Sequence, residues 1–170
     1  EIIGIDHFAK VDDPLAVAMR NQTMRRNFQG YVTDTTDVLV GFGCSSISQF
    51  PQGYVQNSAQ MVEYQQKVEQ GGSAAVRGRA FAAEDEVRKR VIDALMCFMQ
   101  VDLAAISKEY QLETTHFQPE LNALAGEAYR DIVALEGQHV RLTTHDRMAA
   151  RVVATVFDIY RGVAAGRYSK

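Results

Sequence analysis

Short apolar stretches and helical segments alternate in the first third of the chain. Residues 2–5 are apolar and predict a short strand, which the polar pair Asp6-His7 follows. Aspartate directly before Pro14 predicts a helix start, because the carboxylate accepts free N–H groups and proline fits the first helical turn. We expect this helix to end near Arg26.

Two further strands are expected next, followed by a helix. β-branched and aromatic residues at 28–33 and 38–42 predict strands, and the polar residues 34–37 between them predict a hairpin connection. Residues 54–56 predict another short strand. Ser58 is a candidate cap for a helix that reaches about residue 70, where two consecutive glycines stop it.

From Ala83 onward the pattern is mostly helical. Apolar residues at helical spacing mark one face of a long helix: Val87, Val91, Ile92, Leu95, Met96 and Met99. Asp102 is the expected cap of a short helix that runs to Tyr110, and Pro119 is expected to open a third helix that reaches about Arg130.

A β-hairpin and a last helix complete this half. Residues 132–135 and 140–142 predict two strands around a Gly-containing turn, and Thr143 is a candidate cap for the final helix. Three helices, a hairpin and a helix resemble a small winged-helix unit. The chain is therefore expected to be α+β, with a boundary near residues 71–78.

Composition and charge exclude several classes of protein. The chain has 170 residues, of which 46% are hydrophobic and 23% charged, so it is neither disordered nor collagenous. Its apolar runs are far shorter than the ~18 residues of a membrane span. The net charge of −3 argues against nucleic-acid binding by bulk charge. Two cysteines are too few for a disulfide framework and indicate a reducing compartment, and we expect a cytoplasmic protein. The chain starts at Glu1 without an initiator Met and at once enters an expected strand, which favours a piece of a longer polypeptide.

Few of the usual catalytic motifs are present. The sequence has no cysteine pair at metal-binding spacing, no P-loop, no Gly-rich dinucleotide turn and no HExxH motif. A lone histidine is usually structural. Asp6-His7 is the exception, because a polar pair at the end of a strand would face the active site in a βα barrel. A polar strand cap is the alternative interpretation.

Three other segments are candidates for binding. Asn27 and Gln29 share one face of an expected strand and could bind a planar or amide-bearing ligand, or simply lie on a half-buried edge. The small residues of segment 41–48 would let the backbone approach a ligand or another strand. Arg25 and Arg26 could bind a polycarboxylate. The basic residues 88–90 are more typical of a solvated helix face.

Several of these segments resemble one family, the oxygen-independent coproporphyrinogen III oxidases. In the first half the matching segments are Gly4-Ile5-Asp6-His7-Phe8-Ala9, Arg26-Asn27-Phe28-Gln29-Gly30-Tyr31, Gly43-Cys44-Ser45-Ser46-Ile47-Ser48 and Tyr54-Val55-Gln56-Asn57. In the second half they are Arg77-Gly78, Val91-Ile92-Asp93-Ala94-Leu95-Met96-Cys97 and Phe157-Asp158-Ile159-Tyr160. Each motif alone is weak, but their ordered series spans nearly the whole chain.

The resemblance implies a radical S-adenosylmethionine enzyme of haem biosynthesis. Such enzymes convert two propionates of coproporphyrinogen III to vinyl groups, using S-adenosylmethionine and a four-iron four-sulfur cluster on a CxxxCxxC loop. This chain has no such loop. It resembles the C-terminal portion alone, with residues 1–76 as the last strand and helix of a partial βα barrel plus a sheet extension, and residues 77–170 as a helical winged-helix-like domain. The chain by itself is therefore expected to be inactive.

The resemblance also implies two cofactor-binding residues. Ile47 corresponds to the family's isoleucine that contacts S-adenosylmethionine, and Gln29 to a glutamine near the cofactor and substrate cavity. No catalytic or metal-binding residue is carried over. Asp131 and Asp146 stand where the family usually has glycine. Because aspartate tolerates a positive φ only moderately well, we expect them to lower stability and to leave function unchanged.

Two alternatives remain at this point. A nucleic-acid-binding winged helix would need a basic recognition helix, which the acidic residues after Pro119 disfavour. A related haem chaperone or porphyrin-binding protein without decarboxylase activity is the other. The expected partner is coproporphyrinogen III, bound by a monomeric full-length enzyme that has no membrane span and binds no nucleic acid.

Overall fold

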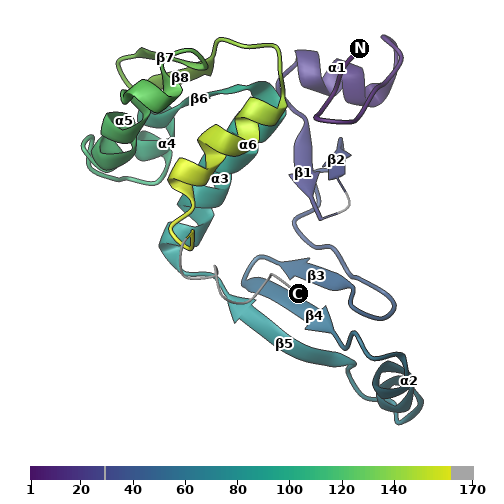
Figure 1. Ribbon diagram of the computed structural model, residues 1–170. Helices are drawn as coiled ribbons and strands as arrows, with labels where there is room; N and C mark the ends of the chain where they lie inside the picture. Colours follow the sequence, from purple (N-terminus) through teal and green to yellow (C-terminus); the bar gives the residue numbers. More distant parts are fainter. Residues whose placement is uncertain (29, 162–170) are drawn as a thin grey trace. The chain divides into compact units, whose positions relative to one another are not determined.

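The computed structural model describes residues 1–28 and 30–161, which fold into two compact units (Figure 1). Unit 1 combines residues 1–33 with the chain from residue 87 onward, and unit 2 consists of residues 34–86. The expected boundary between residues 76 and 77 falls inside a strand of unit 2, β5 (Ala75–Ala80). The assignment of residues 1–76 to the end of a barrel remains a prediction.

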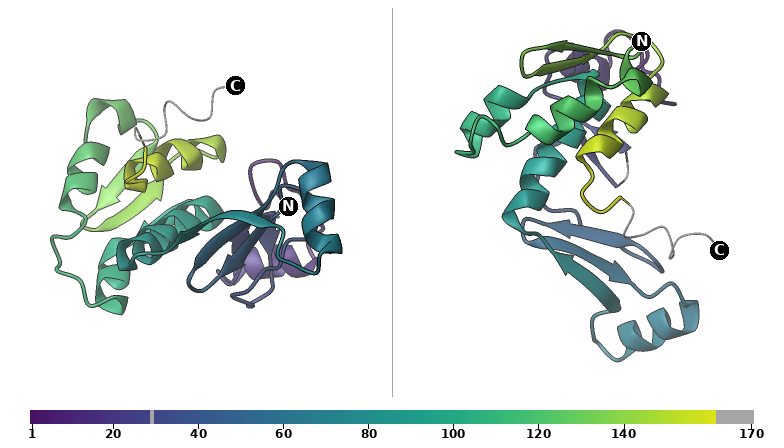
Figure 2. Two further views of the ribbon diagram at one scale, coloured as in Figure 1. Left: turned by 90° about the horizontal axis from the view of Figure 1, so that it is seen from below. Right: turned by 60° about the vertical axis from the view of Figure 1, so that its left-hand side comes forward.

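Helices form most of the second part of unit 1. The long helix α3 (Ala83–Phe98) buries the predicted apolar face, with Val91 and Leu95 fully inaccessible. It lies beside α6 (Met148–Ala154) in both Figure 1 and Figure 2. The two shorter helices that complete the core are α4 (Leu103–Glu109) and α5 (Gln118–Leu124).

A small antiparallel sheet accompanies these helices. Its strand order is β6-β8-β7, with β6 (Gln100–Asp102), β7 (Val133–Glu136) and β8 (His139–Leu142). The β7–β8 hairpin confirms the sequence prediction, whereas β6 was not predicted. Helices and hairpin follow one another in the predicted order.

Capping in unit 1 is partly as expected. Asp102 caps α4 by accepting a hydrogen bond from Ala105 N–H at 3.0 Å. The helix that includes Pro119 ends at Leu124 instead of near Arg130, because Gly126 has an extended backbone, and a 3-10 turn (Glu127–Tyr129) follows.

The start of α6 corrects two predictions. Thr143 is not its cap, since its hydroxyl donates to the carbonyl of Asp131. Asp146 accepts from Met148 N–H at 2.9 Å instead. Among the residues that the structure covers, neither Asp131 nor Asp146 has a positive φ. The strain expected at these two aspartates is therefore absent, and Asp146 stabilises the first turn of α6.

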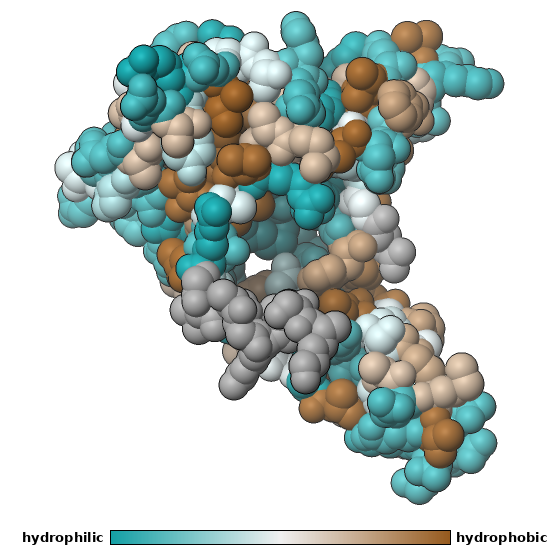
Figure 3. All heavy atoms as spheres, in the orientation of Figure 1, coloured by the Kyte–Doolittle hydropathy of each residue, from teal (hydrophilic) through white to brown (hydrophobic). Residues whose placement is uncertain are grey.

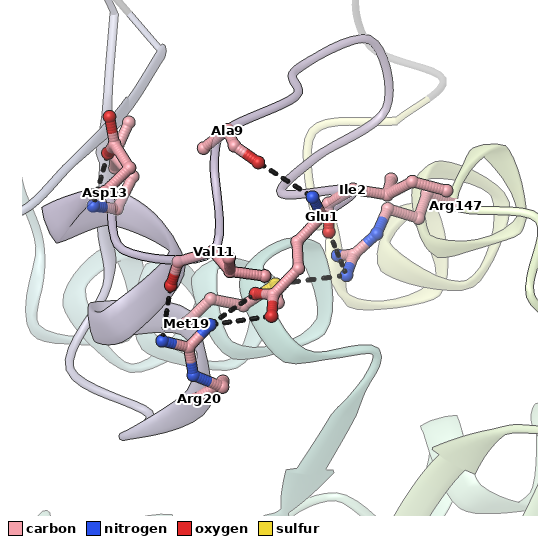
Figure 4. A network of polar contacts seen from close by, with 9 residues as sticks. Glu1, Ile2, Ala9, Val11, Asp13, Met19, Arg20 and Arg147 are labelled. Atoms are coloured by element: carbon pink, nitrogen blue, oxygen red, sulfur yellow. Dashed lines mark hydrogen bonds and ion pairs between the residues drawn. The ribbon is translucent and has the colours of Figure 1, made fainter.

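The N-terminal segment of unit 1 is a loop and not the predicted strand over residues 2–5. The carbonyl of His7 accepts hydrogen bonds from Ile3 N–H at 2.8 Å and Gly4 N–H at 3.3 Å, and Ile2 forms an isolated bridge with Phe8. Figure 4 shows how its ends are held: Glu1 N donates to Ala9 O, Arg20 binds the Glu1 carboxylate, and Arg147 donates to Ile2 O.

A short helix and a two-stranded hairpin follow. Helix α1 (Pro14–Arg20) starts as predicted, with Asp13 accepting from Leu15 N–H, but ends at Arg20 because Gln22 adopts a left-handed φ of 55°. Strands β1 (Arg25–Asn27) and β2 (Gly30–Val32) then pair antiparallel. The predicted hairpin of 28–33 with 38–42 is therefore wrong.

Unit 2 contains a three-stranded antiparallel sheet and one helix. Strand β3 (Ile47–Phe50) pairs with β4 (Gly53–Asn57), which pairs with β5. Of these strands only β4 was predicted. Helix α2 (Met61–Glu69) lies near one end of the strands in both figures and buries no residue. Ser58 accepts from Gln60 N–H just before α2.

Apolar side chains remain at the surface of both units (Figure 3). In unit 2 they include Met61 and Val62 on α2 and Val76 on β5. No helix in the described part of the chain is long and apolar enough to span a membrane.

Candidate functional site

The loop before β3 folds back along that strand. Leu39 and Gln49 exchange two backbone hydrogen bonds, of 2.9 and 2.8 Å. Gly41 consequently lies against Ile47, where a Cβ would come within 2.8 Å of the Ile47 carbonyl oxygen. Of the two explanations for the small residues in this segment, close approach of another strand applies at Gly41.

Polar groups from β4 and α2 hold this loop in place. The Asn57 amide donates to the carbonyls of Gly41 at 3.3 Å and Gly43 at 3.1 Å. The Tyr64 hydroxyl accepts from Gly43 N–H at 3.1 Å, and the Ser46 hydroxyl donates to Gly43 O. The loop backbone is therefore held by hydrogen bonds within unit 2.

Ile47 is the residue that the resemblance implied for cofactor binding. It begins β3, lies opposite Gln56 of β4, and is only half-buried. Its side chain is thus partly open beside a hydrogen-bonded loop, and its role in cofactor binding remains a prediction. Gln29, the second implied residue, lies outside the described residues.

A second cluster lies in unit 1, where the N-terminal loop meets the β1–β2 hairpin. Tyr31 of β2 is buried against Gly4, at which a Cβ would come within 2.0 Å of the tyrosine ring. The His7 ring meets the Tyr31 ring edge to face, with centroids 5.1 Å apart. Gly30 has a φ of +132° and leaves room for His7, whose Nε2 would be 3.2 Å from a Cβ there. The absence of a Cβ at Gly4 and Gly30 thus allows Tyr31 and His7 to pack in this way.

Charged groups also lie around Tyr31. The Arg26 guanidinium carbon is 6.0 Å from the centre of the Tyr31 ring. Burial raises the pKa of the Tyr31 hydroxyl, which donates to Met96 O at 3.3 Å. Burial also raises the pKa of Asp93, although Lys89 and Arg26 oppose the shift. Lys89 forms an ion pair with Asp93 and, with the more weakly acting Arg26, favours its charged form.

The basic residues singled out from the sequence differ in their surroundings. Arg25 and Arg26 are exposed on β1. Arg88, expected on a solvated face, instead forms an ion pair with Glu120 in which both side chains are almost 90% buried. Arg90 is half exposed, as expected of a solvated face.

Asp6 and His7 contact each other, since Asp6 Oδ1 lies 2.7 Å from His7 Nδ1.

The cysteines do not form a metal site. Burial, with the charge of Asp93, raises the pKa of the Cys97 thiol to about 12, while Cys44 is half-buried in unit 2. Among the described residues no group of three His, Cys, Asp or Glu side chains could hold a metal ion. The described residues therefore do not fit an iron–sulfur cluster, which needs several converging thiolates.

Sequence comparison identifies relatives over nearly the whole chain. The chain is 39% identical over 164 residues to the oxygen-independent coproporphyrinogen III oxidase of Paracoccus denitrificans, covering 96% of the chain and 36% of that protein. It is 37% identical over 161 residues to the enzyme of the same name from Escherichia coli, covering 94% and 35%. No protein-family model matches.

A solved structure is also similar to this chain. The coproporphyrinogen III oxidase of Escherichia coli, described as a radical SAM enzyme, matches with a TM-score of 0.86 and 36% identity, over 94% of this chain and 37% of that one. The chain thus spans little more than a third of the length of the relatives it matches, and the match lies in their C-terminal part.

Proposed function

We propose that this chain has the same role in a radical S-adenosylmethionine enzyme as the C-terminal part of the oxygen-independent coproporphyrinogen III oxidases, to which it is homologous. The reaction is the oxidative decarboxylation of two propionates of coproporphyrinogen III, which gives protoporphyrinogen IX. The observation that carries the proposal is the structural match, with a TM-score of 0.86 at 36% identity over 94% of the chain.

The chain's contribution is binding, not cluster chemistry. When bound by the rest of such an enzyme, the cluster and S-adenosylmethionine supply the radical that removes a propionate hydrogen. No group of described residues could hold the cluster. Ile47 instead offers an aliphatic wall for S-adenosylmethionine, while Asn57, which donates to the neighbouring loop, and Tyr64, which accepts from Gly43 N–H, hold that loop.

A hybrid enzyme tests this function. The part of the Paracoccus denitrificans oxidase that this chain does not match would be joined to the 170-residue chain, and the cluster reconstituted without oxygen. We expect this hybrid to convert coproporphyrinogen III to protoporphyrinogen IX, measured by chromatography of the oxidised porphyrins. A hybrid with an intact cluster that cleaves S-adenosylmethionine but releases no product would contradict the proposal. The natural Paracoccus enzyme, assembled by the same joining, is the control.

A further inference from the structure

The Asp6-His7 pair is exposed, and its bond does little for stability. The side chain of Asp6 is 81% exposed and that of His7 43% exposed. Exposed ion pairs of this kind contribute little to folding free energy. The Asp6 carboxylate nevertheless determines which ring nitrogen of His7 carries a hydrogen. An ionised carboxylate can only accept a hydrogen bond, so Nδ1 must be the donor. The other nitrogen, Nε2, is left for a different partner.

The backbone and the rings around His7 fix its position closely. Its carbonyl accepts hydrogen bonds from Ile3 and Gly4, and its ring rests against Tyr31. The left-handed Gly30, without a Cβ, allows Nε2 to come close to the hairpin. An exposed imidazole held by a carboxylate, a loop and an aromatic ring is oriented in advance, as a ligand-binding group must be.

A second cation and apolar surface belong to the same region. Arg26 lies directly across from Tyr31 in the β1–β2 register, so both side chains leave the same face of the hairpin. Phe8, the next residue after His7 in the sequence, is 76% exposed. An imidazole and a guanidinium that both contact Tyr31 could bind carboxylate arms, and the exposed aromatic residue could contact an apolar ring of the same ligand.

We propose that His7 binds a carboxylate of the tetrapyrrole substrate through Nε2, with Asp6 as the residue that orients it and Arg26 as a second positive charge. The inference rests on the proposed function, because that function supplies the tetracarboxylate ligand. In the bound state the imidazole lies between two carboxylates, Asp6 on Nδ1 and the ligand on Nε2; it takes up one proton from solvent or from the ligand's carboxylic acid on binding, so that both nitrogens donate.

The test uses the 170-residue chain with coproporphyrin III, the stable oxidised form of the substrate. Binding would be measured by fluorescence titration, and the imidazole nitrogens would be followed by NMR. We expect the His7 signals to shift and His7→Gln to weaken binding at least about tenfold, as for loss of a charge-assisted hydrogen bond. Asp6→Asn, which changes only an exposed side chain, should weaken binding by less than about fivefold, the most that loss of an exposed ion pair costs, since it loosens the ring's orientation but keeps the imidazole.

Two controls sharpen the result. His145→Gln removes another exposed histidine of unit 1 and should leave the affinity unchanged. The tetramethyl ester of coproporphyrin keeps the ring but lacks the carboxylates, so it should bind no better to the wild type than to His7→Gln. Equal affinity of wild type and His7→Gln for coproporphyrin, equal binding of the ester and the acid to the wild type, or absence of binding would each overturn the inference.

Failure here is distinguishable from failure of the proposed function. An active hybrid enzyme whose chain binds coproporphyrin independently of His7 would overturn the His7 inference and leave the function standing. An inactive hybrid with an intact cluster would overturn the function, whatever the titration shows.

Discussion

Gly4 illustrates how a single residue determines the packing of unit 1. A Cβ at this position would lie 2.0 Å from the Tyr31 ring, well inside any van der Waals contact. Tyr31 is itself buried and cannot move outward without losing its bond to Met96. Gly4→Ala is therefore expected to lower the free energy of unfolding by about 3 kcal/mol, the upper end of the usual cost of overpacking.

Urea unfolding followed by circular dichroism measures this cost. Gly72→Ala is the matched control, because its new Cβ would make only an ordinary contact, 3.5 Å from the Lys67 carbonyl oxygen. Equal midpoints for Gly4→Ala and the wild type would show that the N-terminal loop does not pack on Tyr31 as described.

The two thiols should differ in reactivity. Burial raises the pKa of Cys97 to about 12, so it is almost entirely protonated at neutral pH, and only the thiolate reacts. Cys44 is half-buried and more accessible. We expect a disulfide reagent to modify one thiol of the native chain readily and the second only after denaturation. Cys44→Ser should abolish the fast reaction, and a fast reaction that persists in this variant would show that Cys97 is accessible.

At the scale of elements, a buried ion pair joins α3 to α5. Arg88 and Glu120 are 12% and 11% exposed, and the Arg88 guanidinium also lies 5.5 Å from the centre of the Phe117 ring. Glu120→Ala leaves Arg88 charged and buried without this partner, which typically costs about 3–5 kcal/mol.

A double variant tests whether Arg88 and Glu120 act as a pair. Replacing both residues by apolar side chains of similar size, Arg88→Met with Glu120→Leu, is expected to recover most of the lost free energy of unfolding, because no buried charge remains. If the double variant were as unstable as the sum of the single variants, the two residues would not act as a pair.

How well the elements were predicted depends on what specifies each one. The long apolar face of α3 and the caps at Asp13 and Asp102 are local signals, and the structure confirms them. Strand β5 pairs with β4 across about twenty residues, which no local pattern reveals, whereas β3 pairs with β4 across a two-residue turn but lacks the usual strand-forming composition. Their sequences are rich in Ser, Gln, Gly and Arg and therefore resemble loops.

The candidate site shows the same division. The Asp6-His7 contact joins neighbours in sequence, so the sequence could indicate it. The contact of His7 with Tyr31, and of Gly41 with Ile47, depends on tertiary packing and could not be predicted. Asn57 was part of a matching motif, but its role in holding the loop at residues 41–43 emerged only from the structure.

As a whole molecule, the chain is expected to contribute to binding of the cofactor and substrate but to perform no radical chemistry alone. Its two cysteines lie in different units, and the described residues form no metal-binding group. After anaerobic reconstitution with iron and sulfide, the purified chain should stay colourless and leave S-adenosylmethionine uncleaved. Visible absorbance of an iron–sulfur cluster in the isolated chain would contradict this prediction.

The central claim is that this chain provides part of the S-adenosylmethionine site of a radical enzyme. Its most direct test is equilibrium binding of S-adenosylmethionine to the hybrid enzyme with Ile47→Asp, compared with Val76→Asp, which places the same charge on an exposed position of β5. We expect Ile47→Asp to weaken S-adenosylmethionine binding at least about tenfold, since a charge replaces an apolar contact, while the cluster absorbance and the affinity of Val76→Asp stay unchanged. Full affinity in Ile47→Asp would contradict the claim.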